Sequence, residues 1–212
     1  MKARGDTTNT TPQPEPQPGK YLPISTEDAT EAACKYLQSL QVEGSSRIVR
    51  EFCFMNCRAD IALIGPQWIG VEIKSDTDTS IRLYEQMLFY EMYFPRSIVV
   101  VTEKHLKRVQ KITDDFACSW GLAIARRGRD GAVWLDWKWT ADESMQVELG
   151  WVLGTAWREE LVALCASYGL HHFKSWQRQR LQKAIVESKP DLDELRQRLT
   201  LIMLARESWR PE

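Results

Sequence analysis

One hairpin constrains the fold of this 212-residue chain more than any other segment. Residues 60–64 (Asp-Ile-Ala-Leu-Ile) and 68–74 (Trp-Ile-Gly-Val-Glu-Ile-Lys) have the composition of strands, and the Gly-Pro-Gln between them has that of a turn. In a hairpin centred on Pro66, residues equidistant from the proline lie opposite each other, so Asp60 faces Glu72. Directly opposed side chains share a face and lie about 4.5–5.5 Å apart.

The two faces of this hairpin differ in character. Lys74 returns to the face of Glu72 because strand side chains alternate, while the other face carries Ile61, Leu63, Val71 and Ile73 and suits a core. Two opposed carboxylates destabilise a sheet unless a cation neutralises them, and both are hard oxygen donors of the kind that bind Mg²⁺. The residues favour a divalent metal site. The alternative is an exposed sheet face on which Lys74 forms salt bridges with the two carboxylates.

Asp60, Glu72 and Lys74 stand at the motif positions of the PD-(D/E)XK nuclease superfamily, which this hairpin resembles, with Ala59 in place of the proline. After the Glu-x-Lys strand, Arg82, Gln86 and Tyr90 recur every four residues and so lie on one helical stripe. That Gln-x-x-x-Tyr pattern resembles the helix beside the site in RecB-like nucleases. Glu51-Phe52 before Arg-Ala-Asp is similar to MmcB-like bacterial proteins. The span 45–205 also resembles uncharacterised bacterial and phage members with a helical C-terminal tail.

The resemblance implies a site that holds Mg²⁺, with Mn²⁺ as a substitute. Its ligands would be Asp60, Glu72, the backbone carbonyl of Ile73 and Glu51. Glu27 and Glu31 of the first helix compete with Glu51 for the place of the additional carboxylate, and sequence spacing does not rank the three.

The remaining site residues have implied roles in handling substrate. Lys74 would orient the attacking water or stabilise the transition state, and Gln86 would hydrogen-bond the substrate or a metal-bound water. Arg82 and Tyr90 are expected to contact the nucleic acid. For these helical residues a packing or surface ion-pair role is the open alternative.

Periodicity predicts an α/β fold, a mixed sheet flanked by helices, over residues 21–150. The resemblance implies that this fold is of the restriction-endonuclease-like kind. Residues 1–20 are polar and proline-rich and are expected to be disordered. The predicted elements are a helix over 25–41, strands over 47–55, 59–64 and 68–75, a helix over 79–94, a strand over 97–102, a helix over 104–117 and strands over 120–126 and 132–138.

From Trp157 onward the pattern predicts helices only, so residues 151–212 are expected to form a small helical subdomain. Helices are expected from Trp157, over 175–187 and over 191–206, with Gly169-Leu170 ending the first. This arrangement is similar to small SAP-like nucleic-acid-binding modules, which implies phosphate contacts by Lys174, Arg178, Arg180 and Lys183. A plain packing unit is the alternative.

Charge and composition say less than the motifs about what the protein binds. The formal net charge is −1, although residues 104–129 are basic and 130–160 acidic; a phosphate-tracking stripe and ordinary solvated faces both fit. Nine tryptophans indicate core packing, or a surface for a homodimer or protein partner. Five cysteines, an odd number, and a polar N-terminus without a secretory signal favour a cytoplasmic protein with reduced thiols. No apolar run is long enough for a membrane helix.

The sequence thus predicts a metal-dependent nuclease that hydrolyses DNA in bacterial or phage DNA repair, restriction or defence. Two alternatives stay open: a nucleic-acid-binding module that keeps the fold without catalysis, and a phage factor that binds a host protein. RNA as substrate, endonuclease or exonuclease action, substrate preference and oligomeric state are also open.

Overall fold

The computed structural model of the chain describes residues 22–116, 118–171 and 175–209. The N-terminal segment 1–20 and Lys174, for which the sequence made predictions, lie outside these residues. A six-stranded sheet forms the centre, with its strands side by side in chain order. The strands are β1 (Arg47–Phe54), β2 (Cys57–Ile64), β3 (Ile69–Lys74), β4 (Arg96–Val101), β5 (Gly121–Arg127) and β6 (Val133–Trp139).

The sheet is mixed, as the sequence predicted. Strands β1, β2 and β3 form an antiparallel meander, β3, β4 and β5 run parallel, and β6 pairs antiparallel with β5. Parallel neighbours need long crossover connections, usually helical, and α2 (Leu83–Tyr93) and α3 (Glu103–Asp115) supply them. The α/β class is therefore confirmed.

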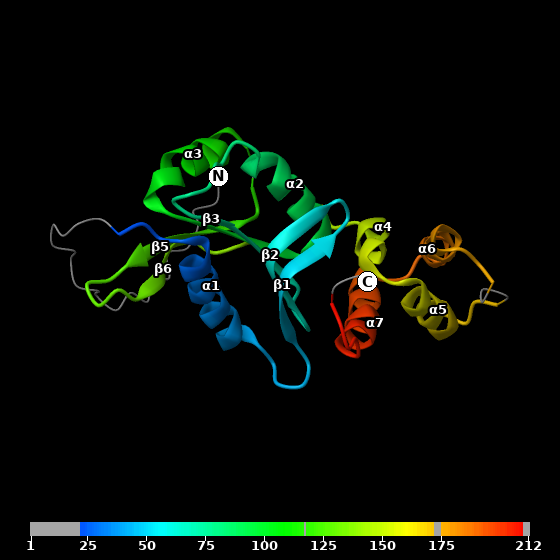
Figure 1. Cartoon of the computed structure of the whole chain (residues 1–212). Helices are drawn as coiled ribbons and strands as arrows, with labels where there is room; N and C mark the ends of the chain where they lie inside the picture. Colours follow the sequence, from blue (N-terminus) through cyan, green and yellow to red (C-terminus); the bar gives the residue numbers. More distant parts are fainter. Residues whose placement is uncertain (1–21, 117, 172–174, 210–212) are drawn as a thin grey trace.

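Helices cover both faces of the sheet (Figure 1). Helix α1 (Thr26–Leu40) packs Ala29, Ala33 and Leu37 against one face, and α2 and α3 lie on the other. The start of α1 agrees with the prediction because Ser25 and Asp28 form a capping box, which satisfies two backbone N–H groups at the helix start.

The β2–β3 hairpin has the predicted register. Ile61 pairs with Val71, Ala62 with Gly70 and Leu63 with Ile69, so the hairpin is centred on Pro66. The four apolar residues assigned to the core face, Ile61, Leu63, Val71 and Ile73, all belong to the cluster under α1. Glu72 and Lys74 consequently project toward the α2 side.

Strands β1 and β2 both interrupt their alternation at one level. Val49 and Phe52, three residues apart, pack into the same cluster, and so do Ala59 and Ala62 on β2. Between them Glu51 adopts φ +56°, an uncommon conformation for a non-glycine residue. The hairpin therefore bends at the level of Glu51 and Asp60, which an alternating pattern does not predict.

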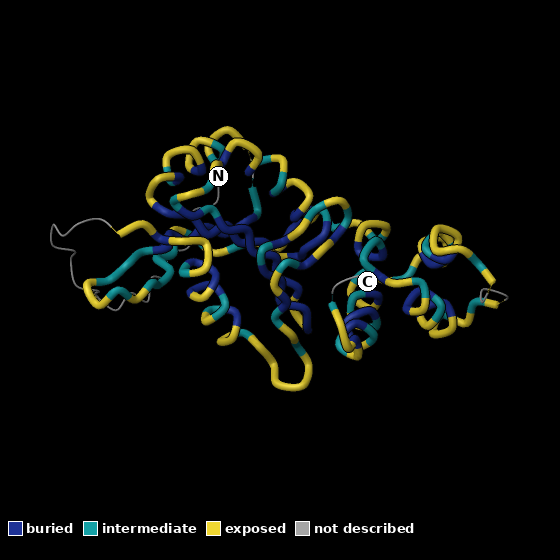
Figure 2. Tube along the Cα trace, viewed as in Figure 1, coloured by how far each residue is buried: buried dark blue, intermediate teal, exposed yellow. Residues whose placement is uncertain are grey.

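The helices after β6 share the core of the α2 side of the sheet. Leu161, Leu181, Ile185 and Leu195 belong to the same buried cluster as the aromatic residues of α2. Figure 2 shows buried positions along these helices as well as along the sheet. The elements are α4 (Leu149–Val152), the 3₁₀ turn η1 (Leu153–Thr155), α5 (Arg158–Ser167), α6 (Arg178–Glu187) and α7 (Leu192–Leu204). The three longer helices were predicted; α4 and η1 are short and were not.

Two buried polar contacts fix the C-terminal helices in place. Trp68 on the β2–β3 connection donates its indole N–H to Thr200 Oγ1 of α7 at 2.8 Å. Arg206 forms a buried ion pair with Glu160 of α5, with Nε 2.6 Å from Oε1. A buried ion pair of this kind is costly to break from one side, because the remaining charge stays buried without its partner.

The tryptophans serve mostly the packing role. Trp68 and Trp120 are buried, and Trp137 packs on Tyr36 of α1 with ring centroids 4.6 Å apart. Trp151 and Trp157 are exposed. The part of the tryptophan-rich region available to a partner is therefore narrower than the sequence suggests.

Gly70 on β3 allows the aromatic residues of α2 to approach the sheet. A Cβ at this position would lie 2.8 Å from Cδ1 of Tyr90 and 2.6 Å from Cε2 of Phe94. We expect Gly70→Ala to lower the free energy of unfolding by about 1–3 kcal/mol, because packed rings would have to shift. Gly150→Ala, where a Cβ meets nothing within 4 Å, is the control in urea unfolding. Equal effects of the two substitutions would show that the close approach is unimportant.

Candidate functional site

The site is organised around the buried carboxylate of Glu72. Its side chain is 2% exposed, and each oxygen has a donor: Lys74 Nζ lies 2.6 Å from Oε1, and the Tyr90 hydroxyl donates to Oε2 at 2.7 Å. Lys74 is itself only 13% exposed. Burying an ionised carboxylate is expensive unless it is paired and hydrogen-bonded, and these two partners meet that requirement.

Asp60 lies one position beyond the last β2–β3 pair, Ile61 with Val71. Its Oδ2 accepts the backbone N–H of Ile73 at 2.6 Å. The Asp60 carboxylate thus accepts the Ile73 N–H just beyond the point where the backbone pairing of β2 with β3 ends. The predicted juxtaposition of Asp60 with Glu72 and Lys74 is present, although Asp60 reaches β3 through its carboxylate.

The electrostatics of Asp60 reflect that position. Burial, and next the neighbouring charge of Glu72, raise its pKa to about 7, with Glu51 adding to the rise. The Ile73 N–H and the Lys74 ammonium act in the opposite direction and do not offset it. Burial and the nearby carboxylates therefore outweigh the effect of the Lys74 ammonium on Asp60.

Glu51 is the additional carboxylate that the structure brings nearest. It lies on β1 between Arg50, which pairs with Ile61, and Phe52, which pairs with Ala59, and so it is level with Asp60. Its Oε2 accepts from Arg58 Nε at 2.7 Å, so its carboxylate is directed to that arginine.

The two competitors of Glu51 lie on α1, which covers the opposite face of the sheet. Glu27 is also held in an ion pair, 2.7 Å from Arg50 Nη1. Of the three candidates left open by the sequence, Glu51 is the one whose charge acts on Asp60.

The residues predicted to form one helical stripe lie on or at the start of α2, and the role of one of them differs from the prediction. Arg82 is the N-cap residue and is exposed, and Gln86 is half-buried one turn before Tyr90. Among the described residues, neither forms an ion pair or a side-chain hydrogen bond. Tyr90 was expected at the nucleic acid, but it is 1% exposed and bonded to Glu72, so we reassign it to the positioning of that carboxylate.

The loop after Lys74 is held by residues that sequence reasoning did not single out. Lys104 Nζ donates to the backbone carbonyls of Asp76, at 2.6 Å, and Asp78. The buried imidazole of His105 lies 2.8 Å from the carbonyl oxygen of Ser75. Asp78 accepts from the N–H and hydroxyl of Ser75. A lysine and a histidine two residues into a helix give no sequence signal for such contacts.

The donor set fits a hard divalent cation in its chemistry, with two carboxylates side by side and a deficit of positive charge. Among the described residues, the Oδ1 atom of Asp60 makes no hydrogen bond, whereas both oxygens of Glu72 are engaged. The described part of the chain contains no group of three or more His, Cys, Asp or Glu side chains placed to hold a metal ion. Lys74 would therefore have to release Glu72 when a cation binds.

The basic residues expected at the C-terminal helices have mixed roles. Arg178 donates to the carbonyl oxygens of Gly154 and Ala156 and so ties α6 to η1. Arg180 stacks over Trp176, with its Cζ 4.3 Å from the ring centroid, and Lys183 lies 3.7 Å from Glu187. Arg180 and Lys183 are exposed, whereas the contacts of Arg178 are internal.

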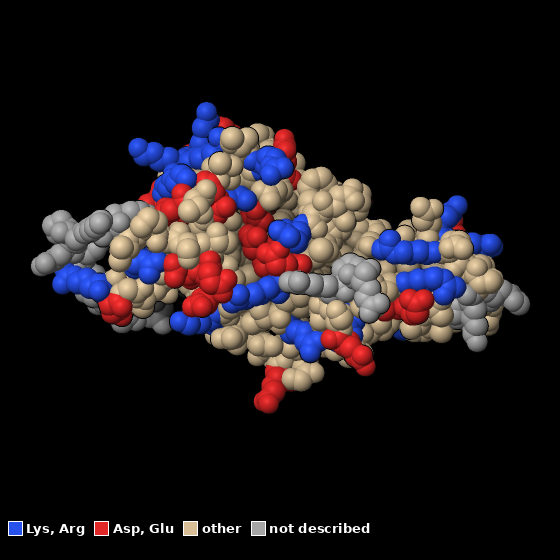
Figure 3. Space-filling view, in the orientation of Figure 1, with Lys and Arg blue, Asp and Glu red and all other residues tan. Residues whose placement is uncertain are grey.

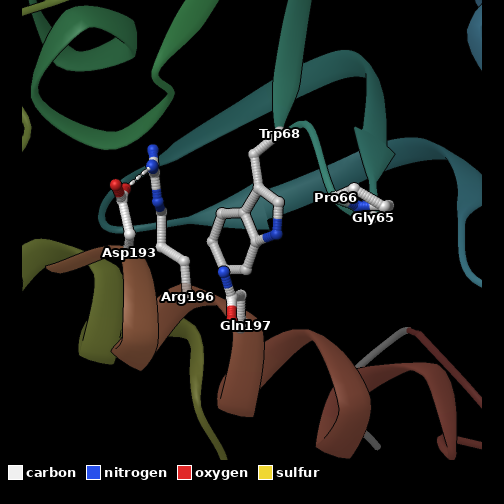
Figure 4. Close-up of a pocket in the computed structure, with 6 residues that line it drawn as sticks. All are labelled: Gly65, Pro66, Trp68, Asp193, Arg196 and Gln197. Atoms are coloured by element: carbon white, nitrogen blue, oxygen red, sulfur yellow. Dashed lines mark hydrogen bonds and ion pairs between the residues drawn. The ribbon is translucent and has the colours of Figure 1, made fainter.

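A separate cavity of about 200 Å³ lies between the β2–β3 turn and α7 (Figure 4). Trp68 points toward α7, and Arg196 forms an ion pair with Asp193 at its edge. The turn is six residues from Asp60, roughly 20 Å along an extended strand. The cavity is therefore distinct from the carboxylate site. Its lining residues are Gly65, Pro66, Trp68, Asp193, Arg196 and Gln197.

Comparison with known families identifies the chain. The model of the family described as bacteriophage P4 protein cII matches residues 27–207, which include the whole sheet and the C-terminal helices. This chain belongs to that family. No significant match was found among curated proteins or among solved structures. The carboxylate site and α2 lie inside the region that the cII family model covers.

Two further predictions can be compared with the structure of this cII family member. All five cysteines are free thiols, as expected. Within the described residues, no helix combines the length and the apolar character needed to cross a membrane.

The raised pKa of Asp60 predicts a specific pH dependence of stability. Because the folded state holds a proton on Asp60 that the unfolded state loses near pH 4, stability falls as pH rises from about 4 to about 7 and then levels off. Asp60→Asn removes this decline. We expect the variant to be more stable than the wild type at pH 8 by on the order of 1–3 kcal/mol. Thermal unfolding from pH 4 to 8 measures it, with exposed Asp115→Asn as control; parallel curves for Asp60→Asn and wild type would contradict the assignment.

The hydroxyl of Tyr90 is expected to contribute to stability through Glu72. Tyr90→Phe removes the donor to Oε2 and leaves a buried charged acceptor with one fewer partner, which costs about 1–3 kcal/mol. Half-buried Tyr84→Phe, on the same helix, is the matched control. Denaturant unfolding of both variants is the measurement, and a loss no greater for Tyr90→Phe than for Tyr84→Phe would exclude the positioning role.

Proposed function

We propose that this protein is a Mg²⁺-dependent nuclease that hydrolyses phosphodiester bonds of DNA. The observation that supports it is the placement of Asp60, Glu72 and Lys74 on one side of the sheet, with Glu72 buried and the pKa of Asp60 raised. A divalent cation is a partner that such a carboxylate pair accepts readily. Membership of a phage family is compatible with action on phage or host DNA.

In this proposal each residue has a defined task. When bound, Mg²⁺ would lower the pKa of a water molecule and polarise the scissile phosphate. Asp60 and Glu72 would hold it, with Ile73 and Glu51 as further oxygen donors nearby. Once Glu72 is shared with the cation, the ammonium of Lys74 is free to orient the water or to stabilise developing negative charge.

The neighbouring residues would position these groups. The Tyr90 hydroxyl orients the Glu72 carboxylate through its hydrogen bond to Oε2. Gln86, one turn earlier on α2, would hydrogen-bond substrate or water, and Arg82 at the helix start would contact phosphate. Exposed Arg180 and Lys183 of α6 would contact DNA farther away.

A second candidate function is DNA binding without cleavage. It is favoured by the engagement of both Glu72 oxygens by Lys74 and Tyr90, which lets the site persist without a metal ion. The two functions differ in one outcome: only the nuclease yields a metal-dependent product.

The decisive test is a cleavage assay on single-stranded, duplex, nicked and flapped DNA with Mg²⁺, Mn²⁺ or chelator. We expect metal-dependent products from the wild type and a loss of at least ~10²-fold in rate for Lys74→Met, because charge stabilisation in the transition state is removed. Lys138→Met, which removes an exposed lysine paired with Asp136 on β6, should retain the wild-type rate.

Folding and catalysis can be separated in this assay. Lys74→Met leaves Glu72 buried without its ion pair, so the double variant Glu72→Gln/Lys74→Met, which removes both charges, is tested beside it. A folded, inactive double variant supports the proposal. Full activity of that variant would exclude Glu72 and Lys74 as the catalytic centre. No product from the wild type on any substrate would exclude the nuclease and leave the binding function.

A further inference from the structure

Helix α3 carries a stripe of basic residues on its outer face. Lys104, Lys107, Arg108 and Lys111 are spaced three and four residues apart and therefore project in one direction. Lys107, Arg108 and Lys111 are all exposed. Figure 3 shows basic side chains gathered over this part of the molecule.

Within residues 22–116, 118–171 and 175–209, no Asp or Glu forms an ion pair with Lys107, Arg108 or Lys111. Farther along the same basic segment, by contrast, Arg126 is paired with Asp136 at 2.7 Å and Arg127 with Asp28 at 2.6 Å. Within the basic segment 104–129, Lys107, Arg108 and Lys111 therefore carry charges that no described carboxylate neutralises, in a chain whose net charge is −1.

The stripe begins at the same end of the sheet as the carboxylate site. Strands β3 and β4 are parallel, Lys74 pairs with Val101, and Thr102 donates its N–H to the Lys74 carbonyl at 3.1 Å. Helix α3 starts at the next residue. Lys104, the first member of the stripe, holds the loop that directly follows Lys74.

Contacts along α3 fix the stripe relative to α2. Arg108 Nη2 donates to the carbonyl oxygen of Ile81 at 3.2 Å, just before α2. At the far end Phe116 stacks on Tyr84 with ring centroids 4.2 Å apart. The basic face is therefore held in a set orientation to the helix that carries Gln86 and Tyr90.

We propose that α3 binds the phosphate backbone of the DNA that flanks the scissile phosphate. From Lys104 to Lys111 the helix rises about 10.5 Å, the length of roughly three nucleotide steps of one strand. Acidic Asp114 and Asp115 follow and end the stripe. The inference rests on the proposed nuclease function for the location of the scissile phosphate, and it specifies a substrate that continues past that phosphate on the α3 side.

The experiment compares two double variants that lose the same charge. Lys107→Gln/Lys111→Gln removes the two stripe lysines and leaves the Arg108 contact intact. Lys35→Gln/Arg96→Gln removes exposed cations on α1 and at the amino end of β4, away from the stripe. Binding of fluorescein-labelled duplex DNA is followed by anisotropy in EDTA over a range of KCl concentrations, and Mg²⁺-dependent cleavage is measured separately.

The stripe variant should bind more weakly, with a slope of log affinity against log salt concentration that is smaller by about 1.8, because each lost phosphate contact removes ~0.9. The control should match the wild type. Restoring charge with Lys107→Arg/Lys111→Arg should restore the slope. Equal slopes for the two glutamine variants, or no DNA binding by the wild type, would overturn the inference.

Because binding is measured without metal, the two proposals can fail separately. Cleavage by the wild type with equal slopes keeps the nuclease and rejects the stripe. A reduced slope without cleavage by the wild type keeps the stripe as a DNA-binding surface and rejects the nuclease.

Discussion

The buried carboxylate of Glu72 is the constraint on which the arrangement of this molecule depends. A charge with 2% exposure is tolerated only when its partners are fixed, and those partners come from two elements, Lys74 on the same strand and Tyr90 on α2. Tyr90 reaches the sheet because Gly70 has no side chain. The contact of α2 with β3 is therefore set by a polar requirement as well as by apolar packing.

That requirement extends to the C-terminal helices through a shared core. Tyr93, one turn beyond Tyr90, is buried and hydrogen-bonded to Thr155 at 2.6 Å, and Thr155 also accepts from Arg206 through its carbonyl oxygen. Arg206 in turn is paired with Glu160. A chain of polar contacts thus runs from α2 to Arg206, which follows α7, and on to Glu160 of α5. The C-terminal helices share a buried core with the α2 side of the sheet.

Much of this arrangement could be predicted from the sequence because it follows from short-range rules. The hairpin register, the faces of β3 and the capping of α1 depend on alternation, turn residues and local hydrogen bonds. The role of Tyr90 could not be predicted, since it depends on how closely α2 approaches the sheet. The left-handed backbone of Glu51 and the capping of η1 by Arg178 escaped prediction for the same reason: both are set by tertiary context that overrides local preference.

The backbone conformation of Glu51 and the buried charge of Asp60 both lower the stability of the folded state. Glu51 is held at φ +56°, a conformation that costs of order 1–3 kcal/mol for a non-glycine residue. Beside it Asp60 has a pKa of about 7 because burial and Glu72 oppose its charge. Apolar residues at these positions would remove the repulsion without loss of the core. Strain and like charge are thus concentrated at one level of the sheet, next to the half-buried Lys74, and this concentration supports the proposed cation and substrate site.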